Sequence, residues 1–194
     1  MNVIILAAGY AVRLEPLTLT TPKPLLEIGG RRIIDRLTDK IAGLGGESSI
    51  AVITNAKFFD KFVSWKAVSG YKGNISLIND GSTNNDNRLG AIKDLILATD
   101  SVGRNQDLLV IAGDNLFDFS LDKFVKFAKD HYRGVSIALY DIGSLDLAKS
   151  FGVLKIDGGN KVVSFEEVAN YNKYHANWRI HTFNRRQKAH FFAV

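Results

Sequence analysis

Residues 7–25 read AAGYAVRLEPLTLTTPKPL and directly follow an apolar run, NVIIL, at residues 2–6. The run predicts a buried strand, and the small residues Ala8 and Gly9 after it let another molecule lie against the main chain. All three prolines of the chain fall within this stretch. Because each proline fixes its own φ angle and restricts the residue before it, the stretch is predicted to be a stiffened loop.

The same loop carries one arginine, Arg13, and one lysine, Lys23. Two cations held near exposed amides after a buried strand suit a polyphosphate ligand. The alternative is an ordinary strand-to-helix connection with surface charges, and spacing alone leaves both open. Loops of this length without regular structure are uncommon unless they are functional.

The composition of the 194 residues predicts a soluble globular protein with one large domain. Its N-terminal apolar run is too short for a secretory signal, and no run approaches the length of a membrane span. The chain has no cysteine, which excludes disulfides and thiolate metal sites and fits the cytoplasm. No membrane partner is therefore expected.

The net charge of +5 is concentrated at the C-terminal end. Residues 168–194 contain five of the 25 basic residues and no acidic one, so the 20 basic residues before them balance 20 acidic residues. The charge is therefore no footprint of a nucleic-acid partner. Residues 168–194 are predicted to be a divergent basic tail, and we hypothesise a frameshift or a divergent gene end, which a neighbouring reading frame in the source gene would reveal.

Apolar runs alternate with helical periodicity along the chain. Strands are predicted over 2–8, 49–54, 74–79, 108–112 and 135–140, helices over 33–44, 58–68, 89–98 and 121–128, and a hairpin over 153–156 and 161–165. This alternation predicts an α/β protein with a mostly parallel central sheet covered by helices on both faces. Ligands of such sheets bind at the carboxyl ends of the strands.

Three polar stretches follow predicted strands at that edge: the first loop, Asn79–Thr83 and Gly113–Asn115. Asp114 leaves a buried strand directly, where a carboxylate can hold Mg²⁺ that also touches substrate phosphates. A helix cap or a turn with Gly113 is an equally good interpretation of that aspartate. Asp94, on the helix after Gly90, is expected to be solvated.

Five motifs resemble those of the sugar-phosphate nucleotidyltransferases. LAAGYAVRLEPLT followed by PKPL resembles the family's signature loop, LAAGxGTRLxPLTxxxPKPL, and GDN at 113–115 is similar to its metal-binding turn. NDGSTNNDNRLGA at 79–91 resembles the base segment, Phe151-Gly152-Val153 the sugar-contacting glycine, and VSFEE at 163–167 the start of the FEEKP strand. The resemblance covers residues 1–167 and implies a Rossmann-like nucleotidyltransferase domain over that range.

The family likeness implies that a nucleoside triphosphate and a hexose 1-phosphate give a nucleotide-sugar and pyrophosphate. Arg13 and Lys23 would then be the catalytic cations and Asp114 the Mg²⁺ ligand. The other implied contacts are Leu6, Ala8, Gly9, Asp80 and Gly90 to the nucleotide, and Gly152 and Glu167 to the sugar. A homo-oligomer is compatible with this likeness.

The chain departs from the family pattern at several positions. The Gly-Thr of the signature loop is Ala11-Val12, which predicts altered phosphate binding. The base segment lacks the glutamine of many thymidylyl and uridylyl members, so the base is left open. Val168 and Ala169 replace the Lys-Pro after Glu167, and no acidic residue follows to serve as a second metal ligand.

Three functions are compatible with these residues. The first is an active sugar-phosphate nucleotidyltransferase, and the second is a catalytically weak or inactive nucleotide-binding homologue, which the missing lysine and second acid favour. The third is a cytidylyltransferase that acts on a small phosphorylated alcohol and would select CTP. A dinucleotide-dependent oxidoreductase is disfavoured because residues 9–13 lack the G-x-G-x-x-G pattern.

Overall fold

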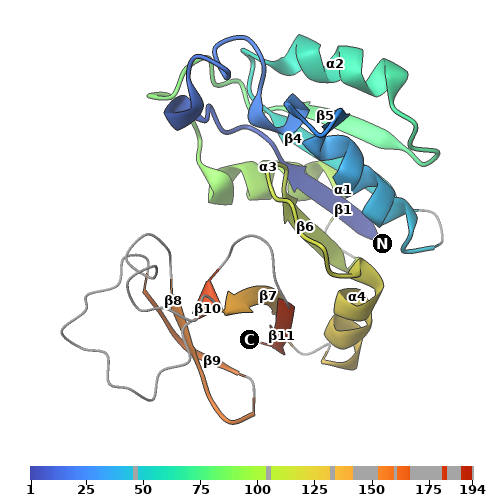
Figure 1. Cartoon of the computed structure of the whole chain (residues 1–194), viewed down its shortest axis with the longest axis vertical. Coiled ribbons are helices and arrows are strands. Elements are labelled where there is room, and N and C mark those ends of the chain that lie inside the picture. The colour runs from blue at the N-terminus through green and yellow to red at the C-terminus, as the bar shows by residue number, and fades with distance from the viewer. Residues whose placement is uncertain are drawn as a thin grey trace. The chain divides into compact units, whose positions relative to one another are not determined.

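The computed structural model describes residues 1–45, 48–103, 106–131, 134–141, 153–159, 161–166, 181–182 and 189–193. The chain divides into two compact units, Met1–Leu116 and Phe117–Val194. Each unit has its own sheet (Figure 1).

The first unit is built on a four-stranded parallel sheet with the strand order β5-β4-β1-β6. Its elements are β1 (Asn2–Leu6), the 3-10 turns η1 (Val12–Leu14) and η2 (Lys23–Leu25), β2 (Glu27–Ile28), β3 (Arg31–Arg32), α1 (Ile33–Ala42), β4 (Ser49–Thr54), α2 (Phe59–Val68), β5 (Ile75–Asn79), α3 (Ala91–Val102) and β6 (Leu108–Ala112). The prediction of an α/β protein with a mostly parallel central sheet is confirmed for this unit.

Strand β1 lies in the middle of this sheet. Its last residue, Leu6, pairs with Ile53 of β4 on one side and with Ala112 of β6 on the other. Val3, Ile4 and Ile5 are fully buried, as expected for a central strand covered on both faces. The loop that follows Leu6 therefore starts from the most firmly held part of the unit.

Helices cover the two faces of this sheet. The connections through α1 and α2 run from β1 to β4 to β5, whereas α3 returns the chain past β4 and β1 to β6 on the far edge. Right-handed crossovers in opposite directions place α3 on the face opposite α1 and α2 (Figure 1). On the α3 face, Ile4, Ala51, Ile53 and Ala98 form a buried apolar cluster.

Helix α3 begins two residues later and ends four residues later than the predicted helix over 89–98. Gly90 has φ 86° and ψ 156°, outside the helical region, so the helix cannot include it. Gly103, with φ 85°, ends the helix in the same way. On α2, Phe62 and Trp65 belong to the core, because they are 0% and 2% exposed.

The second unit contains an antiparallel sheet with the strand order β11-β7-β10-β8-β9. Its elements are α4 (Leu121–Asp130), β7 (Ser136–Asp141), β8 (Val153–Ile156), β9 (Val162–Glu166), β10 (His181–Thr182) and β11 (Ala189–Ala193). The predicted hairpin is confirmed as β8 and β9. Asp157 Oδ1 holds its turn by accepting the backbone N–H groups of Gly159 (2.8 Å) and Lys161 (2.9 Å).

Strands β10 and β11 belong to the stretch predicted as a basic tail, and both pair with β7. The domain boundary after residue 167 stays a prediction. In the part of the chain that the structure describes, no helix combines the length and the apolar character needed to cross a membrane.

Candidate functional site

The site forms where the strand order of the parallel sheet reverses, between β1 and β6. Here the turn after β6 lies directly against the first loop: Gly113 N donates to Leu6 O at 2.8 Å. A Cβ on residue 113 would lie 3.0 Å from Leu6 O and 3.2 Å from Pro24 Cγ. Gly113 therefore allows the GDN turn and the PKPL segment to meet at this edge.

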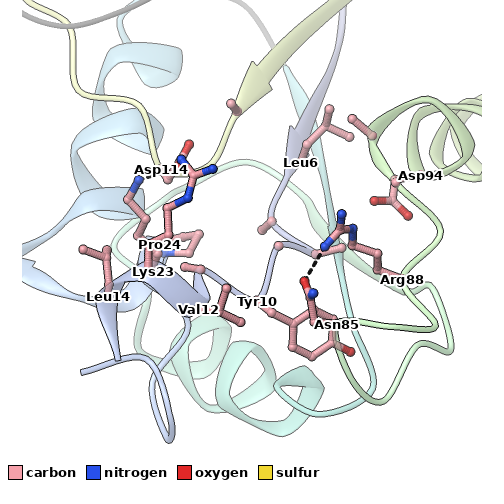
Figure 2. A pocket seen from close by; sticks show the side chains of 18 residues that line it. Leu6, Tyr10, Val12, Leu14, Lys23, Pro24, Asn85, Arg88, Asp94 and Asp114 are labelled. Carbon is pink, nitrogen blue, oxygen red and sulfur yellow. Dashed lines mark hydrogen bonds and ion pairs between the residues drawn. The ribbon is translucent and has the colours of Figure 1, made fainter. Parts of the chain in front are cut away.

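A cavity of about 550 Å³ opens at this edge (Figure 2). Its lining brings together seven of the ten predicted site residues: Leu6, Ala8, Gly9, Arg13, Lys23, Gly90 and Asp114. Asp80 lies outside the lining and contacts Ser82 instead. Gly152 and Glu167 lie outside the described residues.

The backbone at Gly9 and Gly90 is open to the cavity. A Cβ at either position would have no heavy atom within 4 Å outside its chain neighbours, so a ligand can approach the main chain at both places. Gly90 also needs its positive φ of 86°, which L side chains rarely adopt. The loop after β1 and the N-terminal end of α3 thus offer two bare stretches of backbone to one cavity.

Ala11 adopts a left-handed conformation, with φ 50° and ψ 40°. For a residue with a Cβ this conformation costs about 1–2 kcal/mol. Its carbonyl accepts the backbone N–H of Leu14 at 2.9 Å and the hydroxyl of Thr18 at 3.0 Å, and Thr18 is 1% exposed. These bonds hold the turn in the conformation that a glycine would adopt freely.

Asn55, which directly follows β4, fixes the start of the first loop. Its Nδ2 donates to Ala8 O at 2.9 Å, and its Oδ1 accepts the backbone N–H of Phe58 at 3.0 Å. Asn55 is fully buried. The sequence interpretation missed this residue, although a polar side chain at the carboxyl end of the apolar run 49–54 was a usable signal.

The two charged side chains predicted for separate roles, Lys23 and Asp114, form an ion pair. Lys23 Nζ lies 2.6 Å from Asp114 Oδ2, and the side chains are 19% and 39% exposed. Arg13 is exposed on η1 and lines the same cavity. Two cations and one carboxylate from the loops after β1 and β6 therefore line the same cavity.

Asp94 was expected to be solvated, and this expectation is wrong. The residue is 6% exposed and lines the cavity, because the first turn of α3 packs toward the sheet. Burial is the main cause that raises the pKa of Asp94 to about 6, and the charge of Asp80 and a hydrogen bond to it add to the effect.

A series of hydrogen bonds links the carboxyl group of Asp94 to the first loop. The hydroxyl of Ser82 donates to Asp80 Oδ1 at 2.7 Å and also lies 2.9 Å from Oδ2. Tyr10 OH lies 3.2 Å from Ser82 Oγ, and because the serine proton is used on Asp80, the tyrosine is the donor. Burial, above all, raises the pKa of Tyr10, so it keeps this proton at neutral pH.

A metal ion at this site would have few protein ligands. Among the described residues there is no group of three or more His, Cys, Asp or Glu side chains that could hold one. Asp114 still fits Mg²⁺, which commonly takes one or two carboxylates and completes its shell with water and substrate phosphates. Asp114 as the Mg²⁺ ligand stays a prediction.

Comparisons with known proteins agree with this fold. Over the whole chain, the structure resembles a crystal structure assigned as a glucose-1-phosphate thymidylyltransferase of Bacillus anthracis in complex with sucrose, with a TM-score of 0.76 and 24% identity over 71% of that protein. A UDP-glucose pyrophosphorylase complexed with UDP-glucose matches 92% of the chain and 73% of its own length, with a TM-score of 0.69 and 19% identity. At these identities the likeness establishes the fold.

A family model gives the assignment. The model described as Nucleotidyl transferase matches residues 2–185. This range includes all residues that line the cavity and runs past residue 167. Because this match spans nearly the whole chain, the protein is an enzyme of the nucleotidyl transferase family.

Proposed function

We propose that this chain joins a nucleoside triphosphate to a hexose 1-phosphate and releases pyrophosphate. The observation that carries the proposal is the cavity at the β1–β6 edge, which is lined by Arg13, by the Lys23–Asp114 pair and by the open backbone of Gly9. Small residues under a ligand and cations beside it are what a polyphosphate needs.

The proposed step breaks one bond and forms another at the α-phosphorus. An oxygen of the sugar phosphate attacks that phosphorus, the bond to the β-phosphate bridging oxygen breaks, and pyrophosphate leaves with the electron pair. Arg13 holds the β and γ phosphates and balances the charge that grows on the leaving group. Lys23 holds the α-phosphate region, and Ala8 and Gly9 pass under the nucleotide. Such chemistry needs positioning and cations more than acid–base catalysis.

Asp114 is the side chain that would hold Mg²⁺. When bound, the ion would screen the charges of the phosphates and help to align them for displacement. The Lys23–Asp114 contact fits this assignment, because a lysine that moves to the α-phosphate frees the carboxylate oxygen it now occupies.

The second substrate is proposed from the comparisons with known proteins. Gly152 and Glu167, its predicted contacts, lie outside the described residues. The support comes from the family and from two structural neighbours whose names carry glucose 1-phosphate and UDP-glucose chemistry. We therefore propose a hexose 1-phosphate as the class of second substrate.

Release of pyrophosphate tests this function. The purified chain, with Mg²⁺, is given each of ATP, GTP, CTP, UTP and dTTP together with glucose, galactose, mannose or N-acetylglucosamine 1-phosphate. We expect pyrophosphate only when both substrates are present. If every pair gives none while a nucleotide still raises the melting temperature, the chain is a nucleotide-binding homologue instead. Release with CTP and phosphocholine alone would indicate a cytidylyltransferase.

A further inference from the structure

We propose that Asp94 reads the base of the nucleotide through two adjacent N–H groups and that this base is guanine. The inference rests on the proposed function, because it assigns the second end of the same cavity. It concerns a residue that was expected to be solvated. Its support is the placement of Asp94, the unpartnered Oδ1 of its carboxyl group and its neighbour Arg88.

The cavity has two chemically different ends. Lys23 and Asp114 lie on one side of it, and Arg88 and Asp94 lie on the other, with Leu6 between them (Figure 2). If the cations hold the phosphates, the base extends toward Arg88 and Asp94. Gly90, whose bare backbone also lines this end, leaves room for a flat ring.

Asp94 has an unused acceptor at this end. Its Oδ1 is buried and has no hydrogen-bond partner among the described residues. Buried polar atoms nearly always have a partner, and a carboxylate left without a donor is especially costly. The hydrogen bond between Asp94 and Asp80 leaves this oxygen without a partner. A bound molecule with N–H donors can satisfy it.

Above its raised pKa of about 6, Asp94 is an anion that accepts hydrogen bonds. It lies in the first turn of α3, a helix of 12 residues, where the helix dipole stabilises negative charge. An ionised carboxylate has two acceptor oxygens and no donor. The group that complements it is a pair of neighbouring N–H donors on one rigid edge.

Guanine is the base that presents such a pair, at N1–H and the N2 amino group. Adenine and cytosine each place an amino group next to a ring-nitrogen acceptor, and uracil and thymine place one N–H between two carbonyls, so each would turn an acceptor toward one carboxylate oxygen. On its other edge guanine has the acceptors O6 and N7, which suit an arginine. Arg88 is available there, with its guanidinium held at 2.5 Å by Asn85 Oδ1.

Substitution of Asp94 by asparagine provides the test, because it exchanges one acceptor for a donor. Xanthine has an oxygen at C2 where guanine has the amino group, so an amide at position 94 matches xanthine N1–H and O2. The wild-type chain should bind GTP at least about tenfold more tightly than ATP, CTP, UTP, dTTP or xanthosine triphosphate. Asp94→Asn should lose about tenfold or more in GTP affinity and gain a similar factor for xanthosine triphosphate.

Affinities are measured by calorimetry with Mg²⁺ present, and circular dichroism confirms that the variant is folded. Asp86→Asn is the matched control, because it removes the same charge from an exposed position in the loop before α3. It should leave the preference among the nucleotides unchanged. A wild-type preference for another base, or an Asp94→Asn variant with the wild-type preference, overturns the inference while the proposed function stands. If no nucleotide binds the wild-type chain, both fall.

Discussion

Lys23 Nζ and Asp114 Oδ2 lie 2.6 Å apart and join the loop after β1 to the turn after β6. The two residues are 91 positions apart in the sequence, and their contact spans the point where the strand order of the sheet reverses. A lysine on a carboxylate oxygen occupies the same lone pair that a metal ion would use. In the proposed site, the pair would therefore tie phosphate binding by the lysine to metal binding by the aspartate.

Asp114→Asn should reduce turnover by about 100-fold or more, because a single well-placed electrostatic group commonly contributes that much. Its effect on stability should be small, since partly exposed ion pairs contribute about 1 kcal/mol or less. Pyrophosphate release and a thermal melt measure the two effects. Asp118→Asn, at an exposed position four residues later in the sequence, is the control and should keep full activity. Wild-type turnover in Asp114→Asn would remove this residue from the proposed site.

Arg13→Ala should also lower turnover by about 100-fold, because the charge on departing pyrophosphate would lose its cation. Arg13→Lys should restore only part of the loss, since an ammonium group cannot bind two phosphate oxygens in the planar way of a guanidinium. Arg13 is exposed, so both variants should have the same melting temperature as the wild type. Wild-type turnover in both variants would show that neither the charge nor the shape of this side chain is used.

Ala11→Gly should stabilise the protein. Glycine avoids the cost of about 1–2 kcal/mol for a Cβ at φ 50° but adds backbone entropy to the unfolded chain, which leaves a net gain of about 1 kcal/mol. For a chain of this size, the melting temperature should rise by about 2–4 °C. Ala8→Gly, at a buried residue for which no positive φ is found, should lower it instead. A lower melting temperature in Ala11→Gly would contradict the left-handed turn.

The parallel sheet and the cavity lining from the first loop could be predicted because both depend on local sequence. Apolar runs of five or six residues, such as 2–6 and 49–54, indicate buried strands wherever they end up in the sheet. The burial of Asp94 could not be predicted in that way. It depends on the start of α3, which Gly90 sets two residues later than the periodicity indicates. The raised pKa of Asp94 also depends on Asp80, 14 positions earlier in the chain. The Lys23–Asp114 contact likewise needs the strand order, which no single segment contains.

Asp94→Asn should stabilise the protein at pH 8 and have little effect near pH 4. The pKa of Asp94 is raised from 3.8 to about 6, so the folded protein holds the proton more tightly than the unfolded chain. The contribution of the carboxyl group to stability is therefore fully present below about pH 4 and is lost as the pH rises to about 6 and above. Removing the charge should return up to about 3 kcal/mol at pH 8.

Urea denaturation of both proteins at pH 4.5 and pH 8 measures this difference. Asp80, the charged neighbour that contributes to the shift, stays in place in the variant, and the new amide can donate to it. A gain that is equal at the two pH values would show that the free energy comes from packing and not from the charge of Asp94.

Asn55→Ala should destabilise the protein by about 2–3 kcal/mol, because it removes two buried hydrogen bonds and leaves the carbonyl of Ala8 and the N–H of Phe58 without partners.

Asn55→Asp removes only one of these two hydrogen bonds. A carboxylate still accepts the N–H of Phe58, so the bond at the start of α2 is kept. It turns a second acceptor toward Ala8 O, so the bond that holds the loop after β1 is lost. If Asn55 positions the first loop for phosphates, the aspartate variant should bind triphosphate more weakly even where it is fully folded. Calorimetric titration below the melting temperature measures this, and wild-type affinity in Asn55→Asp would limit Asn55 to a role in stability.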